Sequence, residues 1–248
     1  MRLMYLIGFP FDEEGIARRA AQIPHDVLGP DTEVECVTAR NSGTVGDSYY
    51  DLAIFDMYTA EAGLRAEEAG FDALVLDTVS DSGMYVLRSR LSIPVIGPGI
   101  VSCCVAAMLG KKFSIITMWK KWVPLYERNL DAYHLWEKCA SIRAVEVSPN
   151  PEKLFAGKEE EMNERLTAEA RKAIEEDGAD VILLGSTTMH EAGEYMSAHL
   201  PAPVINPGPV AIKLAEAIVE LGLSHSKVAF PTPLTLQDEK FFSLESAG

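Results

Sequence analysis

The sequence contains an internal repeat, and this repeat limits the folds open to the chain. The stretch "GFDALVLDT" at residues 70–78 resembles "GADVILLGS" at 178–186, and "IPVIGPG" at 93–99 resembles "APVINPG" at 202–208. Each copy begins with a nearly continuous apolar run, which is typical of a parallel strand covered on both faces. A polar loop, a helical pattern and a short strand ending before Pro-Gly follow. Two copies of one such unit predict two similar α/β halves.

Apolar runs alternate with helical patterns along the whole chain, which favours βαβ units and parallel sheets. We expect two similar doubly wound, Rossmann-like parallel-sheet halves, related by pseudo-two-fold symmetry, with the site in the cleft between them. The predicted domains are 1–98 plus 206–248, and 99–205. The predicted strands are 2–8, 32–39, 72–77, 93–97, 112–117, 142–147, 179–185 and 203–205. The predicted helices are 12–22, 49–69, 81–91, 100–109, 120–131, 160–177, 189–198 and 207–221.

The net charge and the short apolar runs argue against nucleic acid and membrane partners, and the cysteine spacing argues against a metal site. The 248 residues carry a net charge of −15, so nucleic acid and anionic membrane surfaces would be repelled. No apolar run reaches about 18 residues, and the N-terminal segment resembles a first strand rather than a signal peptide. The four cysteines lack metal-site spacing, and we expect Cys103 and Cys104 to pack in the core. Reduced thiols indicate a cytoplasmic protein.

Small hydroxyl residues follow the two repeated strands. Thr78 and Ser186 occupy equivalent positions, one in each half, and Thr187 and Thr188 follow Ser186. Ligands of open α/β sheets bind beyond the carboxyl ends of the strands. The N–H groups at a helix start, together with these hydroxyls, could hold a substrate carboxylate or an enolate oxygen. The alternative is that each hydroxyl only caps the helix that follows it.

Several stretches together resemble a known family. They are "TVGDSYYDLA" at 44–53, "DTVSDSG" at 77–83, residues 113–144, "GADVILLGSTTM" at 178–189 and "PVINPGPVAIKLAEAIV" at 203–219. They resemble the aspartate/glutamate/hydantoin racemase superfamily, with the hydantoin racemase branch as the best match. The resemblance implies a homo-oligomer that works without a cofactor, and the histidines show no metal-site spacing. It also implies two cysteines, one on each side of the substrate Cα.

This chain departs from the family at both cysteine positions, where it has Thr78 and Ser186. An alcohol is a far weaker acid than a thiol, so neither residue can act as a thiolate. Asp77 and His190 are the nearby groups that could handle protons, and His190 lies four residues after Ser186, within reach of it on a helix. The candidate catalytic residues are therefore Thr78, Ser186, Asp77 and His190. The candidate substrate-binding residues are Val79, Ser80, Thr117, Thr187, Thr188 and Phe9, of which Phe9 lies where the branch has an Asn-containing loop.

Three functions fit these residues. The first is a racemase or isomerase that acts at the Cα of a small carboxylate, amino acid or hydantoin. The second is a lyase (decarboxylase) or hydrolase that uses the hydroxyls as a carboxylate or oxyanion pocket. The third is a non-catalytic binder of a small carboxylate. We favour an enzyme over a binder, because the extra hydroxyls are concentrated at the two cysteine loops. We favour the isomerase among the enzymes, because the family resemblance covers most of residues 44–220.

Overall fold

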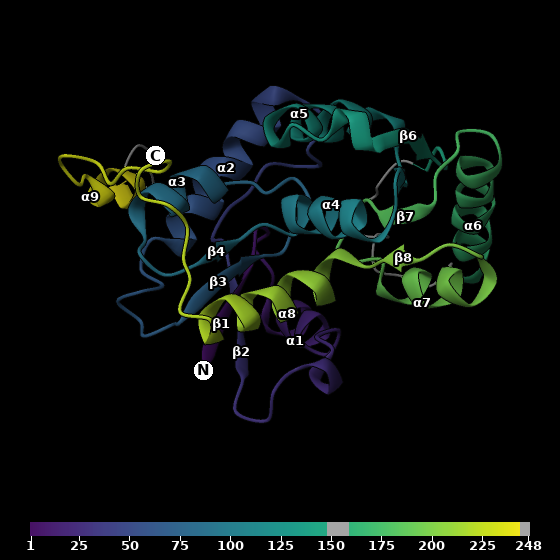
Figure 1. Ribbon diagram of the computed structural model, residues 1–248. Coiled ribbons are helices and arrows are strands. Elements are labelled where there is room, and N and C mark those ends of the chain that lie inside the picture. The colour runs from purple at the N-terminus through teal and green to yellow at the C-terminus, as the bar shows by residue number, and fades with distance from the viewer. Residues whose placement is uncertain (148–158, 244–248) are drawn as a thin grey trace. The chain divides into compact units, whose positions relative to one another are not determined.

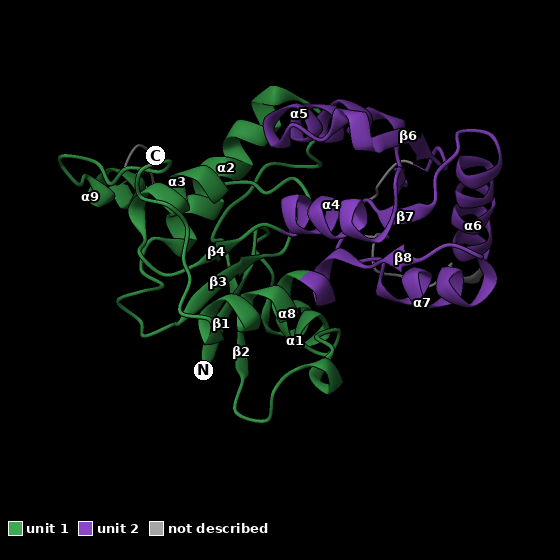
Figure 2. Ribbon diagram, in the orientation of Figure 1, with its two compact units in different colours: residues 1–97, 211–248 green, residues 98–210 purple. Residues whose placement is uncertain are grey.

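The computed structural model describes residues 1–147 and 159–243 (Figure 1). The chain divides into two compact units, shown in different colours in Figure 2. The first unit comprises Met1–Gly97 and Ala211–Gly248, and the second comprises Pro98–Val210. The chain thus leaves the first unit once and returns to it. The domain limits predicted from the sequence, 1–98 plus 206–248 and 99–205, stay a prediction.

The first unit is built on a four-stranded parallel sheet. Its strand order is β2 (Glu33–Thr38), β1 (Arg2–Ile7), β3 (Ala73–Leu76) and β4 (Val95–Ile96). The two central strands, β1 and β3, are almost wholly buried, as the continuous apolar runs predict. The helices of this unit are α1 (Glu13–Ala20), α2 (Tyr49–Gly63), α3 (Met84–Arg90), the part of α8 (Pro207–Glu220) that follows residue 210, and α9 (Asp238–Phe242).

The second unit repeats the same topology. Its strand order is β6 (Cys139–Ala144), β5 (Phe113–Thr117), β7 (Val181–Leu184) and β8 (Val204–Ile205), again all parallel. Helices α4 and α5 contact each other and the sheet, and helices α6 and α7 form a second such pair. These helices span Pro98–Leu109 (α4), Val123–Tyr133 (α5), Glu159–Glu175 (α6) and His190–His199 (α7). Short 3-10 helices lie at His25–Val27 (η1), Lys120–Trp122 (η2) and Trp136–Lys138 (η3).

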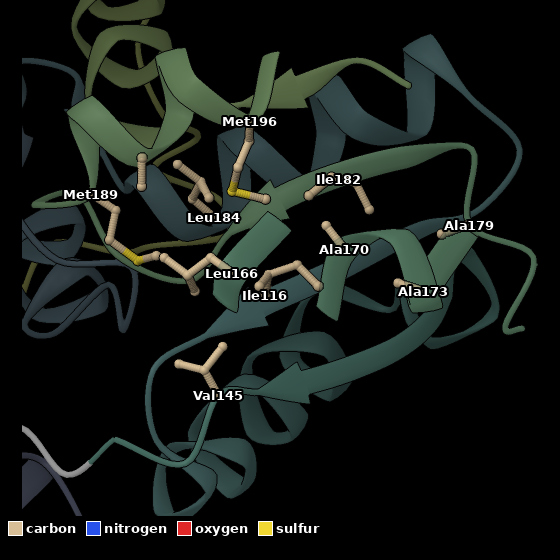
Figure 3. Packing of buried hydrophobic residues seen from close by; sticks show 11 residues of the cluster. Ile116, Val145, Leu166, Ala170, Ala173, Ala179, Ile182, Leu184, Met189 and Met196 are labelled. Atoms are coloured by element: carbon tan, nitrogen blue, oxygen red, sulfur yellow. The ribbon is translucent and has the colours of Figure 1, made fainter. Parts of the chain in front are cut away.

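A cluster of apolar side chains fixes α6 and α7 against the sheet of the second unit (Figure 3). Ile116 on β5 and Leu184 on β7 are fully buried in it, together with Met196 from α7. Met189 also belongs to this cluster, with an exposed fraction of 7%. Because Met189 ends the polar loop after β7, the core holds the far end of that loop.

The described structure confirms the predicted α/β class and corrects four details. Strand β6 begins three residues earlier than predicted, helix α2 ends at Gly63 rather than at 69, and α9 was not expected. The β6 segment is half-buried along its whole length, so neither an apolar run nor an alternation marks its limits. Cys103 is buried as expected, but Cys104 is exposed. The core-packing prediction was therefore wrong for Cys104, which lies on the outer side of α4.

Candidate functional site: two hydroxyl loops

The loop after β3 brings three hydroxyl groups of the first unit together. Thr78 Oγ1 lies 2.5 Å from Ser80 Oγ, and Ser80 Oγ lies 2.9 Å from Ser82 Oγ. The Ser80 N–H also points at Thr78 Oγ1, at 3.2 Å. Such a hydroxyl-to-backbone contact two residues on stabilises a tight turn. We call residues 77–82 the first hydroxyl loop.

The loop after β7 repeats this arrangement in the second unit. Ser186 Oγ lies 2.9 Å from Thr188 Oγ1, and the Thr188 N–H points at Ser186 Oγ at 3.3 Å. We call residues 185–189 the second hydroxyl loop. Thr78 and Ser186, which occupy equivalent positions in the sequence repeat, therefore make the same two contacts. The interpretation of each hydroxyl as a simple helix cap does not describe these contacts, since both hydroxyls bond to a residue within their own loop.

The two loops differ in which side chains remain accessible. Thr78, Ser186 and Thr188 are partly exposed. The predicted substrate contacts Val79, Ser80, Thr117 and Thr187 are all buried. Thr117 ends β5 with its hydroxyl 2.9 Å from the hydroxyl of Tyr126 on α5. Direct substrate binding by these side chains stays a prediction.

Asp77 lies in a buried ion pair. Its carboxylate accepts a hydrogen bond from Arg19 Nε at 2.7 Å, and Arg19 Nη2 also contacts it. The Tyr5 hydroxyl donates to Asp77 Oδ1 at 2.5 Å, and Arg19 Nη2 donates to the Tyr5 oxygen at 2.9 Å. The exposed fractions of the Arg19 and Asp77 side chains are 5% and 4%. The Asp77 carboxylate is therefore buried and paired within the first hydroxyl loop, and its catalytic role stays a prediction.

The electrostatics of this network follow from burial and charge. Burial raises the pKa of Tyr5 well above its usual value, and the Asp77 carboxylate raises it further. Burial by itself would lower the pKa of Arg19, but Asp77 and Tyr5 outweigh it and raise that pKa. The guanidinium therefore stays charged and the phenol stays protonated at every ordinary pH. Arg19 and Tyr5 did not emerge from the sequence, because an arginine in a charged helix and a tyrosine in an apolar strand show no local signal.

His190 begins α7, directly after the second hydroxyl loop. Its Nδ1 lies 2.8 Å from Asn206 Nδ2, and its Nε2 lies 3.5 Å from Glu194 Oε1. Its side chain is 29% exposed. The hydrogen bonds recorded for Ser186 join it to Thr188, so the predicted Ser186–His190 contact is not among the contacts of the described residues. His190 is instead oriented by Asn206, which directly follows strand β8.

Phe9 lies in the loop after β1, next to the first hydroxyl loop on the neighbouring strand. Its ring stacks on Phe11, with ring centres 6.1 Å apart, and meets the edge of Phe55 at 5.0 Å. Phe9 and Phe11 are half-buried, while Phe55 is buried. These three rings form an aromatic contact beside the end of β1, and contact of Phe9 with a substrate stays a prediction.

Burial raises the pKa of three of the four cysteine thiols. Burial raises the pKa of Cys36 to about 11 and that of Cys139 to about 11. Burial also raises the pKa of Cys104. Because the thiolate is the reactive form, these three thiols are poor bases at neutral pH. Among the described residues no group of three or more His, Cys, Asp or Glu could hold a metal ion, and no described helix is long and apolar enough to cross a membrane.

The sequence and the fold of this chain are similar to those of known racemases. The family model described as Asp/Glu/Hydantoin racemase matches residues 14–215. A hydantoin racemase of Pseudomonas sp. (strain NS671) is 31% identical over 198 residues, which are 80% of this chain and 78% of that protein. The structure of allantoin racemase from Klebsiella pneumoniae is 27% identical, with a TM-score of 0.84 and 96% of each chain covered. Arylmalonate decarboxylase shares the fold alone, at 16% identity and a TM-score of 0.60 over 88% of this chain and 92% of that one.

Proposed function

Because the chain belongs to the Asp/Glu/hydantoin racemase family, we propose that it is an isomerase that exchanges the proton at the Cα of a small carbonyl compound. The substrate class is a small carboxylate, an amino acid or a hydantoin. The relatives named above are hydantoin and allantoin racemases, which supports a cyclic amide as the first compound to test. Thr78 and Ser186 take the places of the two family cysteines.

The observation that carries this function is the repeated hydroxyl contact. Ser80 Oγ bonds Thr78 in the first unit, and Thr188 Oγ1 bonds Ser186 in the second. A hydroxyl that accepts a hydrogen bond from its neighbour is a better donor toward a ligand, because hydrogen bonds in a chain polarise one another. Donors of this kind stabilise the enolate oxygen that forms when the Cα proton leaves.

A hydroxyl cannot supply the base, so another group must take the proton. His190 is a partly exposed titratable side chain directly after the second hydroxyl loop. In one arrangement Asn206 donates to Nδ1, and the neutral ring then carries its proton on Nε2. With the Asn206 amide reversed, Nδ1–H donates to its oxygen and Nε2 has a free lone pair. The proposed reaction requires this second arrangement.

In this mechanism the Cα–H bond breaks and its proton moves to His190 Nε2. The electron pair of that bond forms the enolate, whose oxygen accepts hydrogen bonds from the hydroxyls of the second hydroxyl loop. Glu194, 3.5 Å from Nε2, stabilises the imidazolium that results. Return of the proton from the imidazolium gives back the starting enantiomer. Protonation of the opposite face by a solvent water, with the resulting hydroxide neutralised by the imidazolium proton through solvent, gives the other enantiomer. Asp77 takes no part in the proton transfer and holds the first hydroxyl loop through Arg19.

Proton NMR in D₂O tests this function directly, with substituted hydantoins, amino acids and substituted malonates as substrates. We expect the Cα proton of at least one hydantoin to exchange for deuterium, and the rate to fall by about 10²-fold or more in Ser186→Ala. Ser197→Ala is the matched control, because Ser197 lies in the same unit and bonds only the backbone oxygen of Gly193. Loss of CO₂ or ring opening without exchange would contradict the isomerase and favour the lyase or hydrolase.

A further inference from the structure

In both units a buried tyrosine hydroxyl bonds the residue that opens the hydroxyl loop. In the second unit, Tyr126 Oη donates to the backbone oxygen of Gly185 at 2.6 Å. In the first unit, Tyr5 Oη donates to the carboxylate of Asp77 at 2.5 Å. The two tyrosines are 3% and 2% exposed. They come from different elements, α5 and β1, so the sequence repeat does not relate them.

The residue that opens each loop is held by its backbone as well. The Gly185 N–H donates to Ile116 O at 2.8 Å, and the Asp77 N–H donates to Leu6 O at 2.9 Å. Each sheet ladder therefore extends one residue past its central strand. At Gly185 the ladder fixes the N–H and Tyr126 fixes the C=O. Since the C=O belongs to the planar peptide group that carries the Ser186 N–H, Tyr126 sets the orientation of the backbone at Ser186.

The side chains around Gly185 leave no space for a larger residue beside the Tyr126 hydroxyl. A Cβ at this position would lie 2.7 Å from Tyr126 Oη and 2.9 Å from Thr117 Cβ. Tyr126 itself accepts from Thr117 when it donates to Gly185, because the Thr117 Oγ1 atom lies 2.9 Å away. Because Gly185 has no side chain, the Tyr126 hydroxyl can approach the backbone there. At the other end of the loop Met189 is packed in the core, so Ser186 and Thr188 lie between two fixed points.

We propose that Tyr126 and Tyr5 are positioning residues, which hold the second and the first hydroxyl loop, respectively, in the geometry that presents the hydroxyls of Ser186 and Thr78. They act through the loops and do not touch the substrate, because both are buried. Tyr126 has this role in catalysis only if the loop belongs to the proposed isomerase site. Displacement of a reacting group by about 1 Å can lower a rate by roughly 10²-fold.

The test compares Tyr126→Phe with Tyr195→Phe, both in the second unit. The control tyrosine lies on α7, where its ring stacks on His199 at 4.2 Å. Amide hydrogen exchange at Ser186, Thr187 and Thr188 is measured in the wild type and in both variants. We expect exchange to become faster by about tenfold in Tyr126→Phe alone, because the Gly185 carbonyl loses its partner. Equal protection of these amides in both variants would refute the positioning role.

Kinetics separate positioning from a loss of stability. Well below the unfolding temperature, Tyr126→Phe should lower kcat by about 10- to 100-fold and leave KM within about threefold. In the Ser186→Ala background the same change should have almost no further effect, since the group that it positions is gone. An equal loss in both backgrounds would overturn the proposal. Tyr5→Phe in the wild-type and Thr78→Ala backgrounds repeats the cycle in the first unit, should Tyr126→Phe fail to fold.

The two proposals fail in distinguishable ways. A wild-type protein that exchanges no Cα proton contradicts the isomerase function, whereas amide exchange in the second hydroxyl loop still decides whether Tyr126 holds it. A wild-type protein that is active, with full activity in Tyr126→Phe, retains the isomerase function and refutes the positioning role.

Discussion

The buried Arg19–Asp77 pair allows a quantitative test of how the first hydroxyl loop is held. Replacement of Arg19 by Met keeps the length of the side chain but removes the charge that faces the Asp77 carboxylate, whose side chain is 4% exposed. Replacement of Asp77 by Asn removes the charge that faces the buried Arg19 guanidinium. Breaking a buried ion pair from one side costs about 3–5 kcal/mol. We expect each single variant to lose that much free energy of unfolding.

The double variant Arg19→Met/Asp77→Asn should be far more stable than the sum of the two losses predicts. It leaves no buried charge at this pair, and the side-chain oxygen of the introduced asparagine can still accept the Tyr5 hydroxyl. Urea unfolding at pH 7, followed by circular dichroism, gives the three free energies. Close charge pairs have coupling energies of about 1.5–7 kcal/mol, and we expect at least about 2 kcal/mol here. Additivity of the two single losses within about 0.5 kcal/mol would show that the pair does not act as a unit.

Two further predictions concern the first unit. Hydrogen bonds from Lys213 and Thr32 lower the pKa of Glu216 from an ordinary value near 4.5 to about 2. The stability that the Glu216 carboxylate contributes to the fold is therefore complete above about pH 4.5 and is lost as the pH falls toward 2. The wild type should therefore lose its stability advantage over Glu216→Gln between about pH 4.5 and pH 2. If the difference in free energy of unfolding between the two proteins is the same at pH 7 and pH 3, the Lys213–Glu216 ion pair is not the source of that advantage. Gly83→Ala should cost about 2–4 kcal/mol, because φ is +77° and the new Cβ would lie 2.9 Å from the backbone nitrogen of Ala60. Gly222→Ala, at φ +65° with open space around it, should cost only about 1 kcal/mol, and equal thermal shifts would refute the packing argument.

The sequence by itself determined the class of the fold and the position of the two hydroxyl loops. Period and composition are local properties, so continuous apolar runs identified β1, β3, β5 and β7, and the repeat placed Thr78 and Ser186 at equivalent strand ends. Local patterns were weaker at the edges of the sheets, where β6 is half-buried throughout and its limits were misplaced.

Only the tertiary structure decided which of these polar groups are accessible and which are anchored. Asp77 is paired with Arg19, 58 positions away, and with Tyr5, 72 positions away. Gly185 is held by Tyr126, 59 positions away, and His190 is oriented by Asn206 rather than by Ser186. The physical reason is that the partner of a buried polar group is selected by packing between distant segments. A periodic pattern tells which face a side chain occupies, but the group that it meets there comes from another part of the chain.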